Sequence, residues 1–411
     1  MLLTVFARCA GTGLLIASLV AGVMRAARAA EGNCVAPMTY IALDSQLVGK
    51  GEDGVAALGT YERVSPDGRF ILRSYSGARL GKVSLIELPL DPGGRVQAHV
   101  TPLSNEAFPV QGTWRYIVDV TGEHYRLADI LRLGRQAKPL FKGGMTGFYA
   151  AASELVEDTA AVGDTADQPP IPASIRIRSL SWPQDVDPDR QGVGPLQVAT
   201  VTVRDDGSTA RVVETIGPRF ICGDRRSIDG NAFALPMISV DGSEFSAIPQ
   251  APHVGAPSMR VYRLSQENSA EEARCDLVSD LGLSPSKAVF GFPPADGAAW
   301  LVYSDLGHVY VFDRSVGQAF RLDHAMDGVL ASAFPGLTRD GRVIYAATWR
   351  TCADRTTCPS QAGYVVVDPY QSSAYRAYWH RAGRDPPKAC VTTAAVREQR
   401  LRFGRFHGLD P

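Results

Sequence analysis

The cysteines are the residues whose number and spacing most directly indicate a chemistry. The chain has seven: Cys9, Cys34, Cys222, Cys275, Cys352, Cys358 and Cys390. Removal of an N-terminal export signal would take Cys9 away, and six cysteines in an oxidising compartment favour three disulfides.

The spacing of the remaining cysteines favours one set of partners. Cys352 and Cys358 share one short loop, Cys34 and Cys390 lie near opposite ends of the chain, and Cys222 is then left for Cys275. Other pairings are open, because six cysteines allow many. A zinc site is the alternative, but the chain has no CxxC pair with a neighbouring histidine, so we prefer disulfides.

The run Asp185-Val186-Asp187-Pro188-Asp189 is the segment that most resembles a set of metal ligands. Alternating carboxylates can converge on calcium, but an EF-hand loop needs Gly at its sixth position and Glu at its twelfth. Arg190 and Leu196 stand at those positions. We therefore expect a solvated acidic turn and no cofactor, with calcium at a surface structural site as the remaining option.

The other chemistry-bearing residues form no known catalytic pattern. The segment Cys222–Arg226 could bind an anion, but beside a predicted disulfide it is interpreted as a constrained surface loop. The chain has no GxSxG nucleophile elbow, no P-loop and no HExxH pair. The histidines are scattered along it: His99, His124, His253, His308, His324, His380 and His407. No catalytic residue is predicted.

Four Asp-Gly turns, each followed by a strand-like segment, organise the chain. They lie within Ser65–Gly68, Ser239–Gly242, Pro293–Gly297 and Leu337–Gly341. Asp can bond the backbone that follows it, and Gly accepts the positive φ of a tight turn. The aspartates of the last three turns are separated by 55 and 44 residues. Such spacings are typical of four-stranded propeller blades.

These turns resemble the WD40-like Pro-Asp repeats found in the propeller of TolB, where a Ser-Pro-Asp-Gly turn precedes a hydrophobic strand. Residues Ser65–Gly68 match that motif in full, whereas Val240, Ala295 and Arg339 replace the Pro in the other turns. The resemblance implies a propeller. It does not imply the role of TolB, because the segment between Cys34 and the first turn is too short for the N-terminal α/β domain of TolB.

We therefore predict an all-β chain, in which residues 34–390 form a single propeller of four-stranded blades. Six blades are preferred to seven, because the acidic, Ala/Pro-rich segment 156–172 is expected to form a long loop. Strand-like residues 39–43 could complete the last blade, with a Cys34–Cys390 bond locking the ring. Residues 391–411, which carry four arginines, are expected to be a frayed or surface-packed tail in preference to a short basic helix.

The N-terminus resembles an export signal. Arg8 precedes the apolar run 10–24, and Ala27-Arg28-Ala29 offers a cleavage site, which predicts a signal peptide over residues 1–29. The run is shorter than the roughly 20 residues that span a bilayer, so we expect no stable membrane insertion after cleavage. The formal net charge is −1, with 42 Lys and Arg against 43 Asp and Glu, and argues against a nucleic-acid partner.

Two functions remain open. The preferred one is a monomeric, non-catalytic propeller, periplasmic or secreted, that binds an envelope or secreted protein or peptide through its loops. The alternative is a hydrolase or lyase that acts on a sugar, peptide or lactone at the central channel. Polar side chains converging at one channel mouth would favour the enzyme, and an apolar, aromatic-rich face would favour the scaffold.

Overall fold

The computed structural model describes most of the predicted propeller. The described residues are 34–43, 49–50, 56–57, 61–74, 83–89, 99–103, 107–119, 121–143, 151–157, 174–181, 193–194, 196–205, 210–222, 233–249, 258–264, 273–281, 287–292, 294, 299–322, 329–350, 360–381, 383–386 and 388–409. The predicted signal peptide, the loop from residue 158 to 172, the run 185–189 and the pair Cys352 and Cys358 lie outside them.

Four-stranded antiparallel sheets dominate the described chain. The first contains β4 (Tyr61–Val64), β5 (Phe70–Ser74), β6 (Val83–Glu87) and β7 (His99–Leu103). The second contains β8 (Ala107–Pro109), β9 (Tyr116–Asp119), β10 (Glu123–Arg126) and β11 (Phe141–Lys142). In β6 the side chains of Val83 and Leu85 are buried in one cluster and that of Ile86 in another, so both faces of this strand pack against neighbouring sheets.

A nine-stranded sheet follows, and its strands fall into two antiparallel groups. One group is β12 (Ala151–Glu157), β13 (Ser174–Ser181), β15 (Gln197–Asp205) and β16 (Ala210–Cys222). The other is β17 (Phe233–Ile238), β18 (Glu244–Pro249), β19 (Arg260–Leu264) and β20 (Ala273–Asp280), with β14 (Val193–Gly194) beside β17.

The two groups of the nine-stranded sheet meet where β16 pairs in parallel with β20. This pairing places Cys222 opposite Cys275, which is disulfide-bonded. The Cys222–Cys275 bond stays a prediction, and this register supports it.

Two further four-stranded sheets complete the fold. One is β21 (Lys287–Val289), β22 (Trp300–Asp305), β23 (His308–Asp313) and β24 (Gln318–Arg321). The other is β25 (Val329–Leu337), β26 (Val343–Trp349) and β27 (Gln361–Val367), to which the N-terminal strand β1 (Met38–Ala42) is added. A separate pair joins β2 (Gly49–Lys50) and β3 (Ala56–Ala57).

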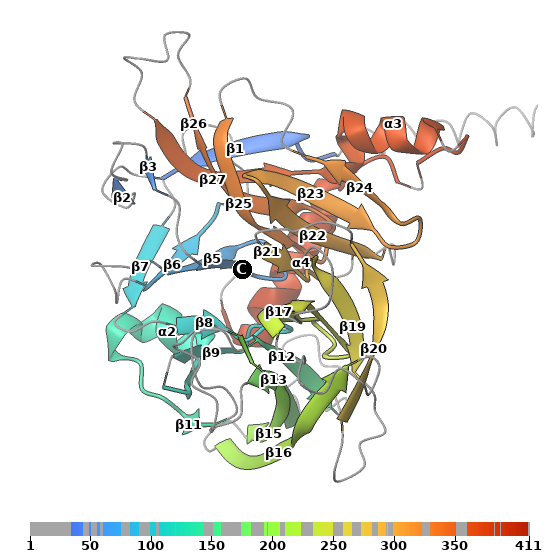
Figure 1. Ribbon diagram of the computed structural model, residues 1–411. Coiled ribbons are helices and arrows are strands. Elements are labelled where there is room, and N and C mark those ends of the chain that lie inside the picture. The colour runs from blue at the N-terminus through green and yellow to red at the C-terminus, as the bar shows by residue number, and fades with distance from the viewer. Residues whose placement is uncertain are drawn as a thin grey trace, which may run out of the picture.

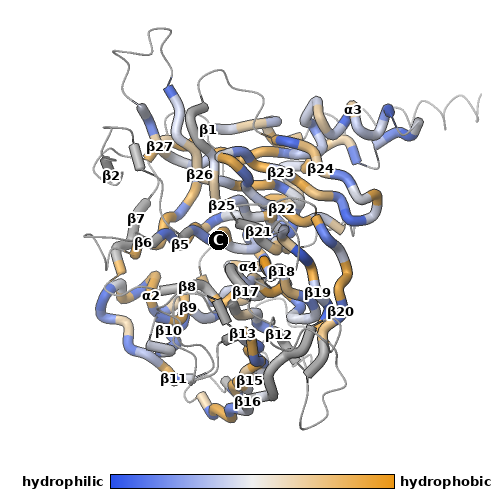
Figure 2. Tube along the Cα trace, in the orientation of Figure 1, coloured by the Kyte–Doolittle hydropathy of each residue, from blue (hydrophilic) through white to orange (hydrophobic). Residues whose placement is uncertain are grey.

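Hydrophobic clusters between neighbouring sheets close these elements into a ring. Figure 1 shows the sheets following one another around a centre in chain order, and Figure 2 shows the apolar residues along their strands. Each sheet or group shares a buried cluster with the next. The last sheet also packs on the first through Val64, Ile71, Phe334 and Ile344. This is the architecture of a β-propeller, as the sequence predicts.

The N-terminal strand closes the ring, as expected for residues 39–43. It pairs with β27 from Met38 opposite Val367 to Ala42 opposite Gly363. The predicted Cys34–Cys390 disulfide is present and links residues 356 positions apart. Beside it, the Val35 amide donates to the Val391 carbonyl over 2.9 Å. Both ends of the ring are therefore tied together covalently and by backbone hydrogen bonds.

Loss of the Cys34–Cys390 bond is expected to destabilise the ring. A disulfide restricts the unfolded chain, and its removal typically costs about 2–5 kcal/mol. We expect a Cys34→Ser/Cys390→Ser variant to lower the free energy of unfolding by an amount in this range, measured by urea denaturation. Reduction of the variant should then have a smaller effect than reduction of the unmodified protein. An unchanged unfolding midpoint would contradict this role.

Five helical segments accompany the strands in the described residues: α2 (Leu127–Leu133), η1 (Gly134–Gln136), η5 (Pro369–Gln371), α3 (Ser373–Arg381) and α4 (Thr393–His407). The last of them shows that the tail, expected to be frayed or surface-packed, contains the basic helix that was the less favoured alternative. Thr392 caps α4 by accepting a hydrogen bond from the Ala395 amide, and Gly408 ends it in the left-handed conformation. The helix buries Val396, Phe403 and His407, and Figure 1 shows it crossing the middle of the ring.

Candidate binding interface at the C-terminal helix

The three Asp-Gly turns that the structure describes share one hydrogen-bonding geometry. In the first, Ser65 Oγ donates to Asp67 Oδ1 over 2.6 Å and accepts from the Phe70 amide over 2.8 Å. Ser239 and Asp241 repeat the hydroxyl-to-carboxylate bond at 2.6 Å, and Thr338 and Asp340 repeat it at 2.8 Å. The hydroxyl and the carboxylate are therefore the shared elements of the turn, and Pro66 is dispensable. The turn predicted within residues 293–297 lies almost wholly outside the described residues.

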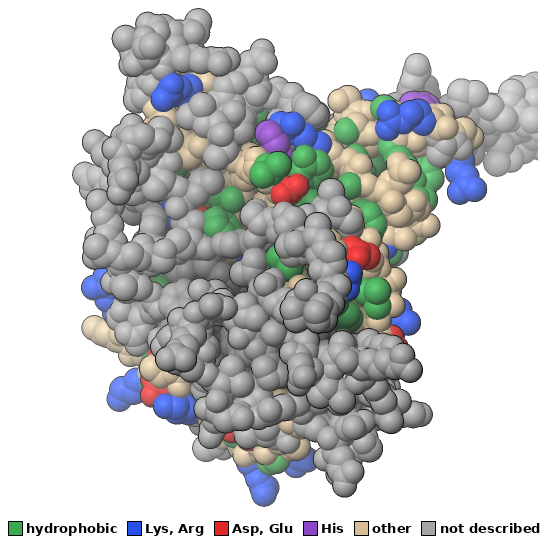
Figure 3. Space-filling view, viewed as in Figure 1, with side chains coloured by type: hydrophobic (Ala, Val, Ile, Leu, Met, Phe, Trp, Pro, Cys, Tyr) green, Lys and Arg blue, Asp and Glu red, His purple; other side chains and the backbone are tan. Residues whose placement is uncertain are grey.

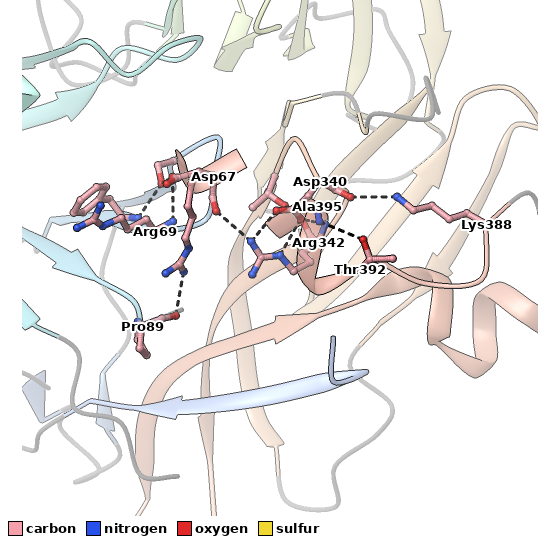
Figure 4. Close-up of polar contacts among 12 residues, drawn as sticks. Asp67, Arg69, Pro89, Asp340, Arg342, Lys388, Thr392 and Ala395 are labelled. Atoms are coloured by element: carbon pink, nitrogen blue, oxygen red, sulfur yellow. Dashed lines mark hydrogen bonds and ion pairs between the residues drawn. The ribbon is translucent and has the colours of Figure 1, made fainter. Parts of the chain in front are cut away.

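Two of these turns lie side by side where the last sheet meets the first. The Arg339 amide donates to the Pro66 carbonyl over 2.8 Å. Arg342 donates through Nη2 to the Asp67 carbonyl over 3.1 Å and also binds both carboxylate oxygens of Asp340, each at 2.8 Å. Figure 4 shows Arg342 between the two turns. This guanidinium thus bridges the first and last sheets of the ring.

The pKa values of the two buried carboxyl groups in these turns are shifted in opposite directions. Burial alone would raise the pKa of Asp340, but the charge and hydrogen bonds of Arg342, with the hydroxyl of Thr338, hold it below its usual value. Burial dominates for Asp67 and raises its pKa, although Ser65 and the nearby Arg400 oppose the shift. The difference follows from Arg342, which pairs with the side chain of Asp340 and only with the carbonyl of Asp67.

The first half of α4 is tied to these turns. Arg400 extends from the helix and donates to the Pro89 carbonyl over 3.0 Å. Burial lowers the pKa of Arg400 to about 10, against the attraction of Asp67. Just before the helix, Lys388 Nζ lies 3.4 Å from the Asp340 carbonyl and 4.5 Å from the ring centre of Tyr370. Figure 4 shows the contact between Lys388 and Asp340.

The far end of α4 is anchored on the loop before β9. His407 donates through Nε2 to the Thr113 carbonyl over 2.9 Å. Arg115 donates to the Phe406 carbonyl over 3.4 Å, and its guanidinium lies 5.4 Å from the centre of the Phe406 ring. These contacts bind the last turn of the helix to the second sheet.

A buried carboxylate on β12 fixes the conformation of the loop before β9 through hydrogen bonds to its backbone. Glu154 accepts from the amides of Thr113, Arg115 and Tyr116 over 2.9 to 3.1 Å, and from the Thr113 hydroxyl. Burial raises the pKa of Glu154 to about 7, although these hydrogen bonds oppose the shift. A Cβ atom at Gly112, whose φ is +99°, would lie 2.5 Å from the Glu154 carbonyl. The loop therefore requires glycine at position 112. Because this loop binds His407, it fixes the C-terminal end of α4.

Acid is expected to weaken the anchor at His407. Burial, together with the positive charge of Arg115, lowers the pKa of His407 to about 3, although the hydrogen bond to Thr113 opposes the shift. The unfolded chain binds a proton below about pH 6.5 and the folded chain does not, so stability falls as the pH drops through this window. Between about pH 7 and pH 5 we expect the wild type to lose about 1–2 kcal/mol more than His407→Gln, measured by urea unfolding. If the free energy of unfolding changed with pH by the same amount in the wild type and in His407→Gln, His407 would not be the source of this pH dependence.

The outward side of α4 carries arginine. Arg397, Arg402 and Arg405 are exposed there, around Leu401, whose side chain is 44% exposed. Arg339 is exposed as well and lies near Arg402. Desolvation of its guanidinium, and then the positive charge of Arg402, lower its pKa. We call Arg339, Arg397, Arg402 and Arg405 the arginine face. By contrast, Figure 3 shows a side of the molecule on which the described basic and acidic side chains are dispersed.

The structure brings few of the sequence-predicted candidates together. Cys34 and Cys390 are bonded, and Cys222 and Cys275 share a register position. His124 is buried, with its ring stacked 4.4 Å from Phe141, and burial lowers its pKa to about 4. No group of three His, Cys, Asp or Glu that could hold a metal occurs among the described residues.

The arginine face is the feature that sequence reasoning missed. The arginines of the tail were visible, but a frayed or surface-packed tail was preferred to a short basic helix. A helix could have been inferred from Thr392 as N-cap, from the seven-residue spacing of Val396 and Phe403, and from Gly408 as C-cap.

The comparisons with known proteins give fold-level likeness only. No family model matches the chain, and no curated protein matches it. An oligogalacturonate lyase in complex with manganese is 12% identical, with a TM-score of 0.35, and the match covers 81% of this chain and 96% of that one. A putative TolB from Agrobacterium tumefaciens is 15% identical, with a TM-score of 0.30 and coverage of 64% and 79%. The Cps50 (Swd1) β-propeller domain of Myceliophteria thermophila is 10% identical, with a TM-score of 0.33 and coverage of 75% and 96%.

No helix among the described residues is long and apolar enough to span a membrane.

Proposed function

We propose that this chain is a six-bladed propeller of the cell envelope or exterior that acts as a non-catalytic scaffold for a protein or peptide. Six blades follow if the two groups of the nine-stranded sheet count separately and β1 completes the last blade. The clusters between neighbouring sheets, one of which joins the last sheet to the first, support this count.

The fixed position of α4 is the observation that carries the scaffold proposal. Arg400 and His407 hold the helix against the ring, and the disulfide to Cys390 holds the segment that leads into it. A preorganised surface binds a partner with little loss of conformational entropy. The contacts of Asp67, Asp340 and Glu154 brace this surface, which gives these buried carboxylates a structural role.

Crosslinking in the native envelope tests the proposal. The tagged mature protein would be crosslinked, recovered by affinity and analysed by mass spectrometry, beside an unrelated exported protein with the same signal and tag. Reproducible enrichment of one envelope or secreted protein is expected. Replacement of the segment 158–172 by a Gly/Ser linker would show whether that loop contributes to binding. Recovery of nothing beyond the control would contradict the scaffold function and favour a small-molecule substrate.

A further inference from the structure

The arginine face concentrates positive charge that the described residues leave largely uncompensated. Glu398 pairs with Arg402, four residues away on α4, where both side chains are more than half exposed. None of the ion pairs formed between described residues includes Arg339, Arg397 or Arg405. The whole chain carries a net charge of −1, so this concentration is a local property of the α4 surface.

Like charges on this face oppose one another. Desolvation is the larger cause of the lowered pKa of Arg339, and the positive charge of Arg402 adds to it; the Arg339 guanidinium lies 5.5 Å from the centre of the Phe292 ring. Arginines held in such proximity gain free energy when a carboxylate approaches, because the anion offsets their repulsion. Their planar guanidinium groups also match carboxylates in a bidentate geometry.

The distance between the arginines along α4 indicates how far apart the carboxylates of a ligand should be. Arg397 and Arg405 lie on either side of Leu401 and are separated by about 12 Å along the helix axis, at about 1.5 Å per residue. An extended peptide advances about 3.3 Å per residue, so carboxylates at positions i and i+4 are about 13 Å apart. Such a peptide presents both carboxylates on one side, because side chains alternate along a strand.

We propose that the arginine face binds an extended acidic segment of a partner protein, with carboxylates four residues apart and an apolar side chain between them against Leu401. The proposal rests on the scaffold function and specifies its partner chemistry. The apolar side chain fits because Leu401 is the large apolar residue that the helix exposes between Arg397 and Arg405. Arg402 and Arg339 would contact a further carboxylate beyond this pair.

A protein segment fits this surface better than a lipid surface does. A helix that lies in a membrane interface directs its apolar side to the lipid and its basic side to water. In α4 the apolar side, with Val396 and Phe403, faces the ring and is buried. The outward side therefore offers charge and a single large apolar residue, which suits a charged peptide.

Peptide binding to the intact mature protein tests the proposal. The probe is a dye-labelled Gly/Ser peptide with glutamates at i and i+4 and leucine at i+2, and fluorescence anisotropy measures its affinity at low salt. Arg397→Glu/Arg405→Glu is expected to weaken binding about tenfold, because two attractive contacts become repulsive. Arg204→Glu/Arg211→Glu, at paired exposed positions on β15 and β16, makes the same change of net charge and is the matched control, which should bind like the wild type. Circular dichroism and urea unfolding would verify that both variants fold.

The peptide series separates the possible outcomes. Tighter binding of the i, i+4 peptide than of an i, i+1 peptide of the same charge supports the proposal. Equal affinities of the two peptides for the wild type, or an unchanged affinity in Arg397→Glu/Arg405→Glu, would overturn it. Binding of the wild type to phosphatidylglycerol vesicles, lost in the same variant and without peptide binding, would also overturn it. The scaffold function would survive these results if envelope crosslinking still captured a partner, and would fail separately if it did not.

Discussion

Gly363→Ala is expected to detach the closing strand and lower the free energy of unfolding by about 3 kcal/mol or more, as overpacking against rigid neighbours does. A Cβ atom at Gly363 would lie 2.0 Å from the Ile41 carbonyl and 3.0 Å from the Cα of Ala42. Both atoms belong to the backbone of β1, which pairs with β27 at this position. The strands must separate to admit the methyl group.

A second glycine provides the control for this variant. Gly317→Ala also introduces one methyl group, but nothing lies within 4 Å of the new atom, and only the strain of a φ of +66° remains. We expect a loss of about 1 kcal/mol for Gly317→Ala. Urea denaturation would measure both, and the rate of reduction of Cys34–Cys390 by dithiothreitol would report on ring opening. Similar losses in the two variants would show that β1 does not close the ring as described.

Arg342→Ala is expected to cost about 3–5 kcal/mol, the typical effect of removing one partner from a buried ion pair. The Asp340 side chain is fully buried and that of Arg342 is 7% exposed, so the variant leaves an uncompensated carboxylate. It also removes the donor that joins Asp340 to the Asp67 turn. The contact between the first and last sheets should weaken with it.

A double variant and a pH series test this assignment. Arg342→Ala/Asp340→Asn removes the charge together with its partner and should recover part of the loss. In the wild type the depressed pKa of Asp340 contributes stability at neutral pH, which is lost as the pH falls through that pKa. Without Arg342, burial would raise the pKa instead, so the deficit of Arg342→Ala should shrink in acid. A deficit independent of pH would contradict the ion-pair account.

The repeat geometry was accessible from the sequence because it depends on local chemistry. Each of the three described Asp-Gly turns is made by a hydroxyl, a carboxylate and a glycine within a few residues, and such turns are visible in a linear pattern. The closing strand was also predictable, since a ring must join its ends and residues 39–43 were apolar and strand-like.

The polar network under α4 was not predictable, because it joins residues that are far apart in the chain. Arg342 meets the Asp67 carbonyl across 275 positions, and His407 meets the Thr113 carbonyl across 294. No local pattern encodes such contacts. For the same reason Arg400 could not be distinguished from Arg402 in the sequence, although one is largely buried against the turns and the other is exposed.

Site-specific photo-crosslinking in living cells would test most directly whether the α4 surface is the binding face. A photoreactive amino acid would replace Leu401 on α4 in one strain and Val213 on β16 in another, since these side chains are 44% and 57% exposed. We expect a discrete crosslinked species from position 401 that contains an acidic protein segment and disappears in Arg397→Glu/Arg405→Glu, with none from position 213. A partner captured at position 213 and not at position 401, or crosslinking at 401 that survives the charge reversal, would contradict the account.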